Sequence, residues 1–165
     1  MYIKENKINK CLVSEYRNRK SGFTLIEILV VIGIIAVLAA VVLVAINPAR
    51  QFKLARDSQR VSNITAILNA IGQNIAENKG ILNCNGIELP ATSTLIMATA
   101  TSTFNIASCL VPNYISTLPY DPSASGAHYI NNTDYNTGYS IYQDINGRIT
   151  IVANGEITNP ISITR

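Results

Sequence analysis

The sequence predicts an α+β fold, in which a long N-terminal helix packs against a small antiparallel sheet of three to four strands. Three observations lead to this prediction. Nineteen consecutive residues from Ile28 to Ile46 lack a polar side chain, and a helical repeat of apolar residues then continues to Ile75. Near the C-terminus, two Asn-Gly dipeptides separate segments in which apolar and polar residues alternate. A chain of 165 residues allows one small folded domain with an appended segment.

Charge divides the same chain unevenly. Residues 1–22 carry six Lys or Arg against two Glu, which is a net charge of +4. The remainder carries seven Lys or Arg against eight Asp or Glu, which is a net charge of −1. Because the basic residues are concentrated at the N-terminus, the sequence pI of about 8.8 gives no reason to infer a nucleic-acid partner.

Residues 23–79 are predicted to form one long helix. A helix rises about 1.5 Å per residue, so the apolar part, about 23–46, is long enough to cross the hydrocarbon core of a membrane. Pro48 predicts a kink where the helix leaves the membrane, because proline cannot donate a backbone hydrogen bond. Beyond it, one apolar stripe is expected to face the distal domain, with the charged residues 50–60 largely off it. The stripe consists of Leu54, Val61, Ile64, Leu68, Ile71 and Ile75, and Gly80 is the expected stop.

Residues 80–165 are predicted to form the distal globular domain, with loops over 81–120 and a sheet over about 127–163. The dipeptide Asn146-Gly147 lies between two alternating segments, which is a strong hairpin signal if both turn residues have positive φ. A later strand contains Pro160, and proline within a strand indicates an edge position.

The most informative stretch is residues 20–33, Lys-Ser-Gly-Phe-Thr-Leu-Ile-Glu-Ile-Leu-Val-Val-Ile-Gly. A secretory signal peptide would have a shorter apolar core with its cleavage site after that core, whereas here Gly22 precedes a longer one. An ordinary signal anchor is the second alternative. Neither alternative explains Glu27, a carboxylate inside an otherwise apolar span, where charge is costly and usually functional.

This stretch, over Lys20–Val31, closely resembles the class III signal of type IV prepilins and type II secretion pseudopilins. The resemblance implies the pilin fold and cleavage after Gly22 by a membrane peptidase, which then methylates the new N-terminus at Phe23. Glu27 corresponds to the family's glutamate, which would neutralise the Phe23 amine of its own or a neighbouring subunit. Residues 118–122, Leu-Pro-Tyr-Asp-Pro, resemble a Pro-x-Asp-Pro turn of many major pilins and pseudopilins.

The expected function is therefore that of a structural subunit of a type IV pilus-like filament. The alternatives are a major-type pseudopilin of a type II secretion system, and a membrane-tethered binding domain that does not polymerise. An anchored secreted enzyme is disfavoured because no catalytic constellation stands out. The implied partners are a prepilin peptidase/methyltransferase, copies of the same chain, minor pilins, an assembly platform with its motor ATPase, and the membrane. The leader is expected in the cytoplasm and the distal domain outside the inner membrane, in an extracellular filament or an envelope-spanning pseudopilus.

Two smaller features complete the sequence-based expectations. Removing the leader removes Cys11 and leaves Cys84 and Cys109 as a candidate disulfide, with two buried free thiols as the alternative. No cofactor is expected. The oxygen-rich segment 131–136 has a spacing that fits no recognisable calcium loop, so a solvated turn is favoured over a calcium site. The single histidine, His128, is expected to be a strand residue.

Overall fold

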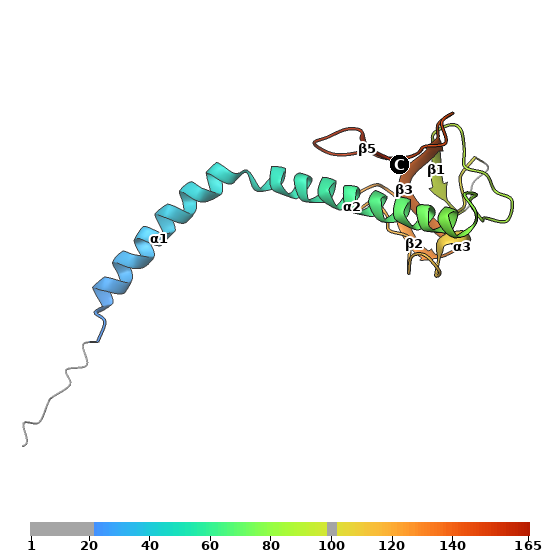
Figure 1. The fold of residues 1–165 in the computed structure, drawn as a ribbon. Coiled ribbons are helices and arrows are strands. Elements are labelled where there is room, and N and C mark those ends of the chain that lie inside the picture. Colours follow the sequence, from blue (N-terminus) through green and yellow to red (C-terminus); the bar gives the residue numbers. More distant parts are fainter. Residues whose placement is uncertain (1–21, 99–101) are drawn as a thin grey trace, which may run out of the picture. The chain divides into compact units, whose positions relative to one another are not determined.

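The computed structural model describes residues 22–98 and 102–165, and the chain divides into two compact units, Met1–Ala45 and Ile46–Arg165 (Figure 1). Cys11 and the leader before Gly22 lie outside the described residues. In the first unit, α1 (Leu25–Ile46) has no buried residue and is long and apolar enough to cross a membrane. Because α1 is apolar on every side, it has the character of a lipid-facing or self-associating helix rather than of a globular surface.

The helical segment is interrupted at Asn47, where a single helix with a kink was expected. Asn47 adopts the left-handed conformation, with φ 45°, and its side chain accepts a hydrogen bond from the Arg50 backbone N–H at 3.3 Å. Pro48 therefore occupies the first position of a new helix, α2 (Pro48–Glu77), where its missing N–H costs nothing. The helix ends before the predicted stop at Gly80, which has φ 87°.

The second unit contains a five-stranded antiparallel sheet in the order β1-β3-β4-β5, with β2 also pairing with β3. The strands are β1 (Thr94–Met97), β2 (His128–Asn131), β3 (Asp134–Gln143), β4 (Ile149–Ala153) and β5 (Ile161–Thr164), and one short helix, α3, spans Ala107–Leu110. The predicted α+β architecture is confirmed. The expected strand number was too low, because β1 lies inside the segment that was expected to form only loops.

The β3–β4 hairpin forms at Asn146-Gly147, but the predicted turn geometry is wrong. Only Gly147 of the pair has a positive φ, at 81°. The turn is instead organised by Asp144, whose carboxylate accepts the backbone N–H groups of Asn146 and Arg148 at 2.9 Å each. The predicted edge position of the last strand is confirmed, since β5 is last in the sheet order. The prediction that this strand contains Pro160 is wrong, because β5 begins at Ile161 and Pro160 lies just before it.

The core of the second unit lies between α2, the sheet and α3. Ile64, Leu68 and Ile71 of the predicted stripe are buried, whereas Val61 is 43% exposed. The buried face of α2 also includes Asp57 and Arg60, so the expectation that the charged residues lie largely off this face is wrong for these two. A buried charge must be paired, and the partners come from loops that are distant in sequence.

Candidate functional site

The residues singled out by the sequence motif meet at the start of α1. The Thr24 backbone N–H and hydroxyl both donate to the Glu27 carboxylate, at 2.8 and 2.7 Å, and the Glu27 backbone N–H donates to the Thr24 hydroxyl at 3.3 Å. This reciprocal arrangement is a capping box, which satisfies backbone N–H groups that have no partner within the helix. In the described structure, the carboxylate therefore points back along the chain toward Phe23.

The orientation of Glu27 matters for the amine that cleavage would create. Phe23, Glu27 and three apolar residues of α1 line one shallow hollow of about 350 Å³ on this helix. The Phe23 nitrogen, which would become the amine, is one residue from the Thr24 N–H that Glu27 already binds. A free ammonium at Phe23 and the Glu27 carboxylate would carry opposite charges at the same helix start, so the two groups are suited to neutralise each other.

Gly22 has no packing contact that requires glycine among residues 22–98 and 102–165. A Cβ built on Gly22 would meet no atom within 4 Å, and its φ lies outside the left-handed region. Folding of the described residues thus imposes no requirement for glycine here. Any sensitivity of this position to larger residues would come from an external protein that reads the Gly22-Phe23 bond.

A second cluster of polar and charged side chains, which we call the Arg60 network, lies in the globular unit and is buried at its centre, at Asp57, Arg60 and Asp121. Its members are Arg56, Asp57, Arg60, Asp121, Ser123 and Glu156. The Arg60 guanidinium, 2% exposed, binds both oxygens of Asp121 at 2.7 and 3.0 Å and one oxygen of Asp57 at 2.8 Å. Ser123 and Glu156 accept further bonds from it at 2.6 and 3.4 Å. The network joins α2 to two loops that are 61 and 96 residues away in sequence.

The loop between β4 and β5 is held to α2 by the same network. Asp57 accepts the backbone N–H groups of Glu156, Ile157 and Thr158, and Arg56 forms a bidentate ion pair with Glu156. Although burial alone would raise the pKa of Asp57, these N–H groups and Arg60 lower it to about 2. The ion pair with Arg56 likewise lowers the pKa of Glu156 to about 2. Because both pKa values are depressed, the network stabilises the fold above about pH 4, and this contribution is lost as the pH falls toward 2.

Sequence reasoning did not predict the Arg60 network. Asp121 had been noted only as part of the Pro-x-Asp-Pro resemblance, and Arg60 only as a charged residue near the stripe. The spacing of residues on α2 does give a signal that Arg60 is buried. Asp57, Arg60 and Ile64 recur every three or four residues and therefore share one face of the helix. The partners in the two loops could not be found this way, because they come from elsewhere in the chain.

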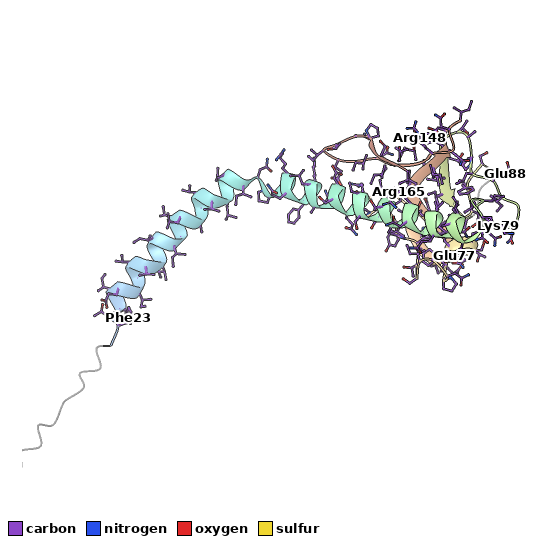
Figure 2. All side chains as sticks on the ribbon, in the orientation of Figure 1. Phe23, Glu77, Lys79, Glu88, Arg148 and Arg165 are labelled. Atoms are coloured by element: carbon purple, nitrogen blue, oxygen red, sulfur yellow. A yellow bond between two sulfur atoms is a disulfide. The ribbon has the colours of Figure 1, made fainter. Side chains whose placement is uncertain are left out.

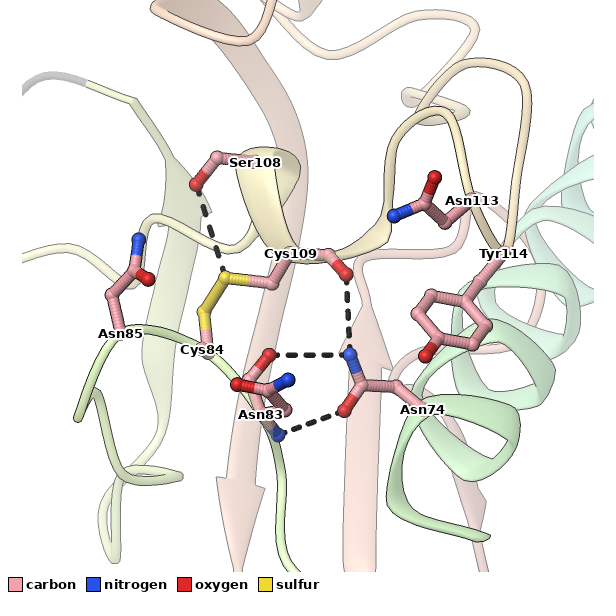
Figure 3. A pocket seen from close by; sticks show the side chains of 8 residues that line it. All are labelled: Asn74, Asn83, Cys84, Asn85, Ser108, Cys109, Asn113 and Tyr114. Atoms are coloured by element: carbon pink, nitrogen blue, oxygen red, sulfur yellow. Dashed lines mark hydrogen bonds between the residues drawn. A yellow bond between two sulfur atoms is a disulfide. The ribbon is translucent and has the colours of Figure 1, made fainter. Parts of the chain in front are cut away.

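Cys84 and Cys109 are joined by a disulfide with a Cα–Cα distance of 5.1 Å. The bond lies beside a polar pocket of about 180 Å³ (Figure 3). In that pocket the Asn74 side-chain amide donates to the carbonyls of Asn83 and Cys109, both at 3.2 Å, and its oxygen accepts the Asn83 N–H at 2.8 Å. The disulfide and Asn74 together fix the irregular segment that follows α2.

The disulfide is expected to be present in the protein purified from cells. Thiol labelling of the denatured but unreduced chain should find both Cys84 and Cys109 protected. Closing the loop between them, across a sequence separation of 25, should stabilise the globular unit by about 3 kcal/mol in the chain-entropy treatment. Labelling of both thiols before reduction would contradict the pairing.

The oxygen-rich segment 131–136 comprises the end of β2, the turn at Asn132 and Thr133, and the start of β3. The Asn131 side-chain oxygen accepts both the backbone N–H and the hydroxyl of Thr133, at 2.8 and 2.7 Å. Asp134 is bound by His128, which lies in β2, at 3.0 Å. Among residues 22–98 and 102–165, no group of three or more His, Cys, Asp or Glu side chains is placed to hold a metal ion.

Residues 17–43 match the family model described as the prokaryotic N-terminal methylation motif. The matched segment includes Gly22, Phe23, Thr24 and Glu27, and extends through most of α1. No curated protein and no solved structure matches the chain.

Proposed function

We propose that this chain, whose prokaryotic N-terminal methylation motif is the class III signal of type IV prepilins and pseudopilins, is a structural subunit of a type IV pilus-like filament. The observation that carries the proposal is the placement of the motif. Its glutamate lies in the first turn of a membrane-length helix, and its carboxylate accepts the backbone N–H of Thr24, the residue next to the one that cleavage would expose. A membrane tether would use this carboxylate only to cap the start of the helix, and an uncharged side chain is sufficient for a cap.

The apolar surface of α1 supports assembly through this helix. None of its residues is buried in the described structure, and the only acidic residue in its first turn is Glu27. Packing of α1 helices from many subunits would remove that surface from water and lipid. In such a bundle an unpaired ammonium at Phe23 would be costly, so pairing with Glu27 favours one axial register over others.

The finer assignments follow from the proposed role. Before assembly, the subunit resides in the inner membrane through α1, with its leader in the cytoplasm. Its partners are then the prepilin peptidase/methyltransferase, minor pilins and an assembly platform with its motor ATPase. The role needs no cofactor and no catalytic group in the chain itself. A type II secretion pseudopilin would use the same motif and helix, so it remains the second candidate.

Processing gives the most direct test. In cells that contain the peptidase, the mature chain should begin at Phe23 with a methylated amine, because Gly22 ends the basic leader. Intact-mass measurement of the purified chain decides this, and sheared filaments should contain the same species as their main component. Retention of residues 1–22, or a cut within residues 36–45, would overturn the proposal. Gly22→Ala should be partly processed and a bulky residue at this position blocked.

A further inference from the structure

The end of the globular unit beyond the last turn of α2 carries apolar side chains that the fold does not use. Ile81 is 72% exposed, and Ile145, in the β3–β4 turn, is fully exposed. Turn positions usually carry small polar residues, and exposed apolar groups that cluster mark an interaction surface. Figure 2 shows Lys79 and Glu88 at this same end of the unit.

Ile81 and Ile145 line two adjoining hollows, of about 260 and 510 Å³ respectively. Both hollows are also lined by Leu89 and Gln143. We call this surface the distal hollow and define it by Ile81, Ile87, Glu88, Leu89, Gln143 and Ile145. Cavities of about 150 Å³ in proteins hold a benzene molecule, so the distal hollow has room for an aromatic ring. Glu88 at its rim has no hydrogen-bond or ion-pair partner within the described part of the chain.

The opposite end of α2 carries a matching group. Phe52, in the second turn of this helix, is 65% exposed, and Arg50 and Lys53 flank it. Neither basic side chain forms an ion pair with any of the described residues, whereas Arg56 one turn later is paired with Glu156. We call Arg50, Phe52 and Lys53 the basic aromatic turn.

The basic aromatic turn and the distal hollow cannot meet within one chain. The 30 residues of α2 rise about 45 Å, and Ile81 lies beyond its last residue. Any contact between the two surfaces must therefore form between two copies. Because the surfaces are different and complementary, such a contact is heterologous, and a heterologous contact that does not close on itself propagates into a filament.

We propose that the basic aromatic turn of one copy docks into the distal hollow of another, with Phe52 seated among the apolar side chains and Lys53 or Arg50 beside Glu88. The occupant is a second copy of this chain, because a cation-flanked ring matches a partly apolar hollow with an acidic rim. This inference rests on the proposed function. The competing role for Phe52 is membrane anchoring, since aromatic and basic residues are enriched where a span meets the lipid headgroups.

Cross-linking in sheared filaments tests the contact without altering it. The variant Gln51→Cys/Asn146→Cys places one thiol beside each surface and keeps Phe52 and the hollow intact. A short bifunctional maleimide should give a ladder of covalent multimers, because each copy contributes one thiol of each kind. Either single-cysteine variant should give no ladder of covalent multimers once the filaments are denatured. The matched control, Gln51→Cys/Ser125→Cys, should give no ladder, since Ser125 is exposed but lies outside the distal hollow.

The contribution of Phe52 is tested in the same double-cysteine chain. Phe52→Ala should reduce the yield of cross-linked multimers about tenfold or more, as expected for the central aromatic residue of an interface. Ile157→Ala, at another exposed apolar side chain, should leave it unchanged. Abundant filaments without a ladder, an equal ladder from the Ser125 control, or an unchanged ladder in Phe52→Ala would overturn the docking contact and leave the filament role standing. If the wild-type chain forms no filaments in the presence of its machinery, the filament role fails and the docking contact fails with it.

Discussion

Glu27→Gln should abolish or severely slow filament assembly while leaving processing and membrane insertion intact. Glutamine keeps an oxygen that can accept the Thr24 N–H and hydroxyl, so the capping box and the start of α1 should be preserved. Only the charge that would compensate the Phe23 amine is lost. Each incoming subunit would then bury an unpaired ammonium, at a cost on the order of 3–5 kcal/mol per broken pair. Sheared-filament yield should fall sharply while cut protein accumulates in the membrane fraction.

A matched substitution tests whether the effect is specific to the Glu27 carboxylate or follows from the loss of any carboxylate in the chain. Glu77→Gln removes a carboxylate at the end of α2, where the amide oxygen can still accept the Tyr114 hydroxyl. This variant should assemble at wild-type abundance. Coexpressed with wild-type chain, Glu27→Gln should enter filaments poorly. Filaments of Glu27→Gln at wild-type yield would show that the charge pair is not the basis of assembly in this protein.

The sequence predicted the elements whose signals are local. Nineteen residues without a polar side chain are sufficient to identify α1, and alternation around Asn146-Gly147 identifies the β3–β4 hairpin. β1 was missed because its four residues, Thr94–Met97, are too few to show alternation. Its pairing with β3, across 39 to 47 residues of sequence, makes it a strand. The sequence predicted only a kink at Pro48. The break between α1 and α2 lies one residue earlier, at Asn47, whose side chain caps the second helix.

The difference between local and long-range signals also explains which site residues were predicted. Gly22, Phe23 and Glu27 lie close together in one sequence motif, so the sequence alone identifies them. The structure adds that Thr24 orients the Glu27 carboxylate. The Arg60 network depends on ion pairs between distant segments. The helical repeat places Asp57 and Arg60 on the same face of α2 as Ile64, but it does not reveal the partners that make burial of Arg60 possible, which are Asp121 and Glu156.

Arg60→Met should be the most destabilising single change in the globular unit. Methionine fills much of the same space, but it leaves Asp57 and Asp121 buried without the cation that binds both. Breaking a buried pair by removing one partner costs about 3–5 kcal/mol. A domain of this size has a total stability on the order of 10 kcal/mol, so thermal unfolding should begin far below the wild-type temperature. Near-ultraviolet circular dichroism of the tyrosines in the detergent-solubilised mature chain would follow the transition.

Arg148→Met provides the control, because it removes a different Arg–Asp pair whose arginine side chain is 62% exposed. Exposed pairs contribute about 0–1 kcal/mol, so this variant should unfold close to wild type. A second measurement identifies charge as the cause. The stability difference between wild type and Arg60→Met should shrink as the pH falls from about 4 toward 2, because protonation neutralises the carboxylates that the variant leaves unpaired. A stability difference that stays constant over this pH range would mean that Arg60 stabilises the unit through packing and not through its charge. If Arg148→Met destabilised the unit as much as Arg60→Met, the large effect of Arg60 could not be attributed to the burial of its ion pairs.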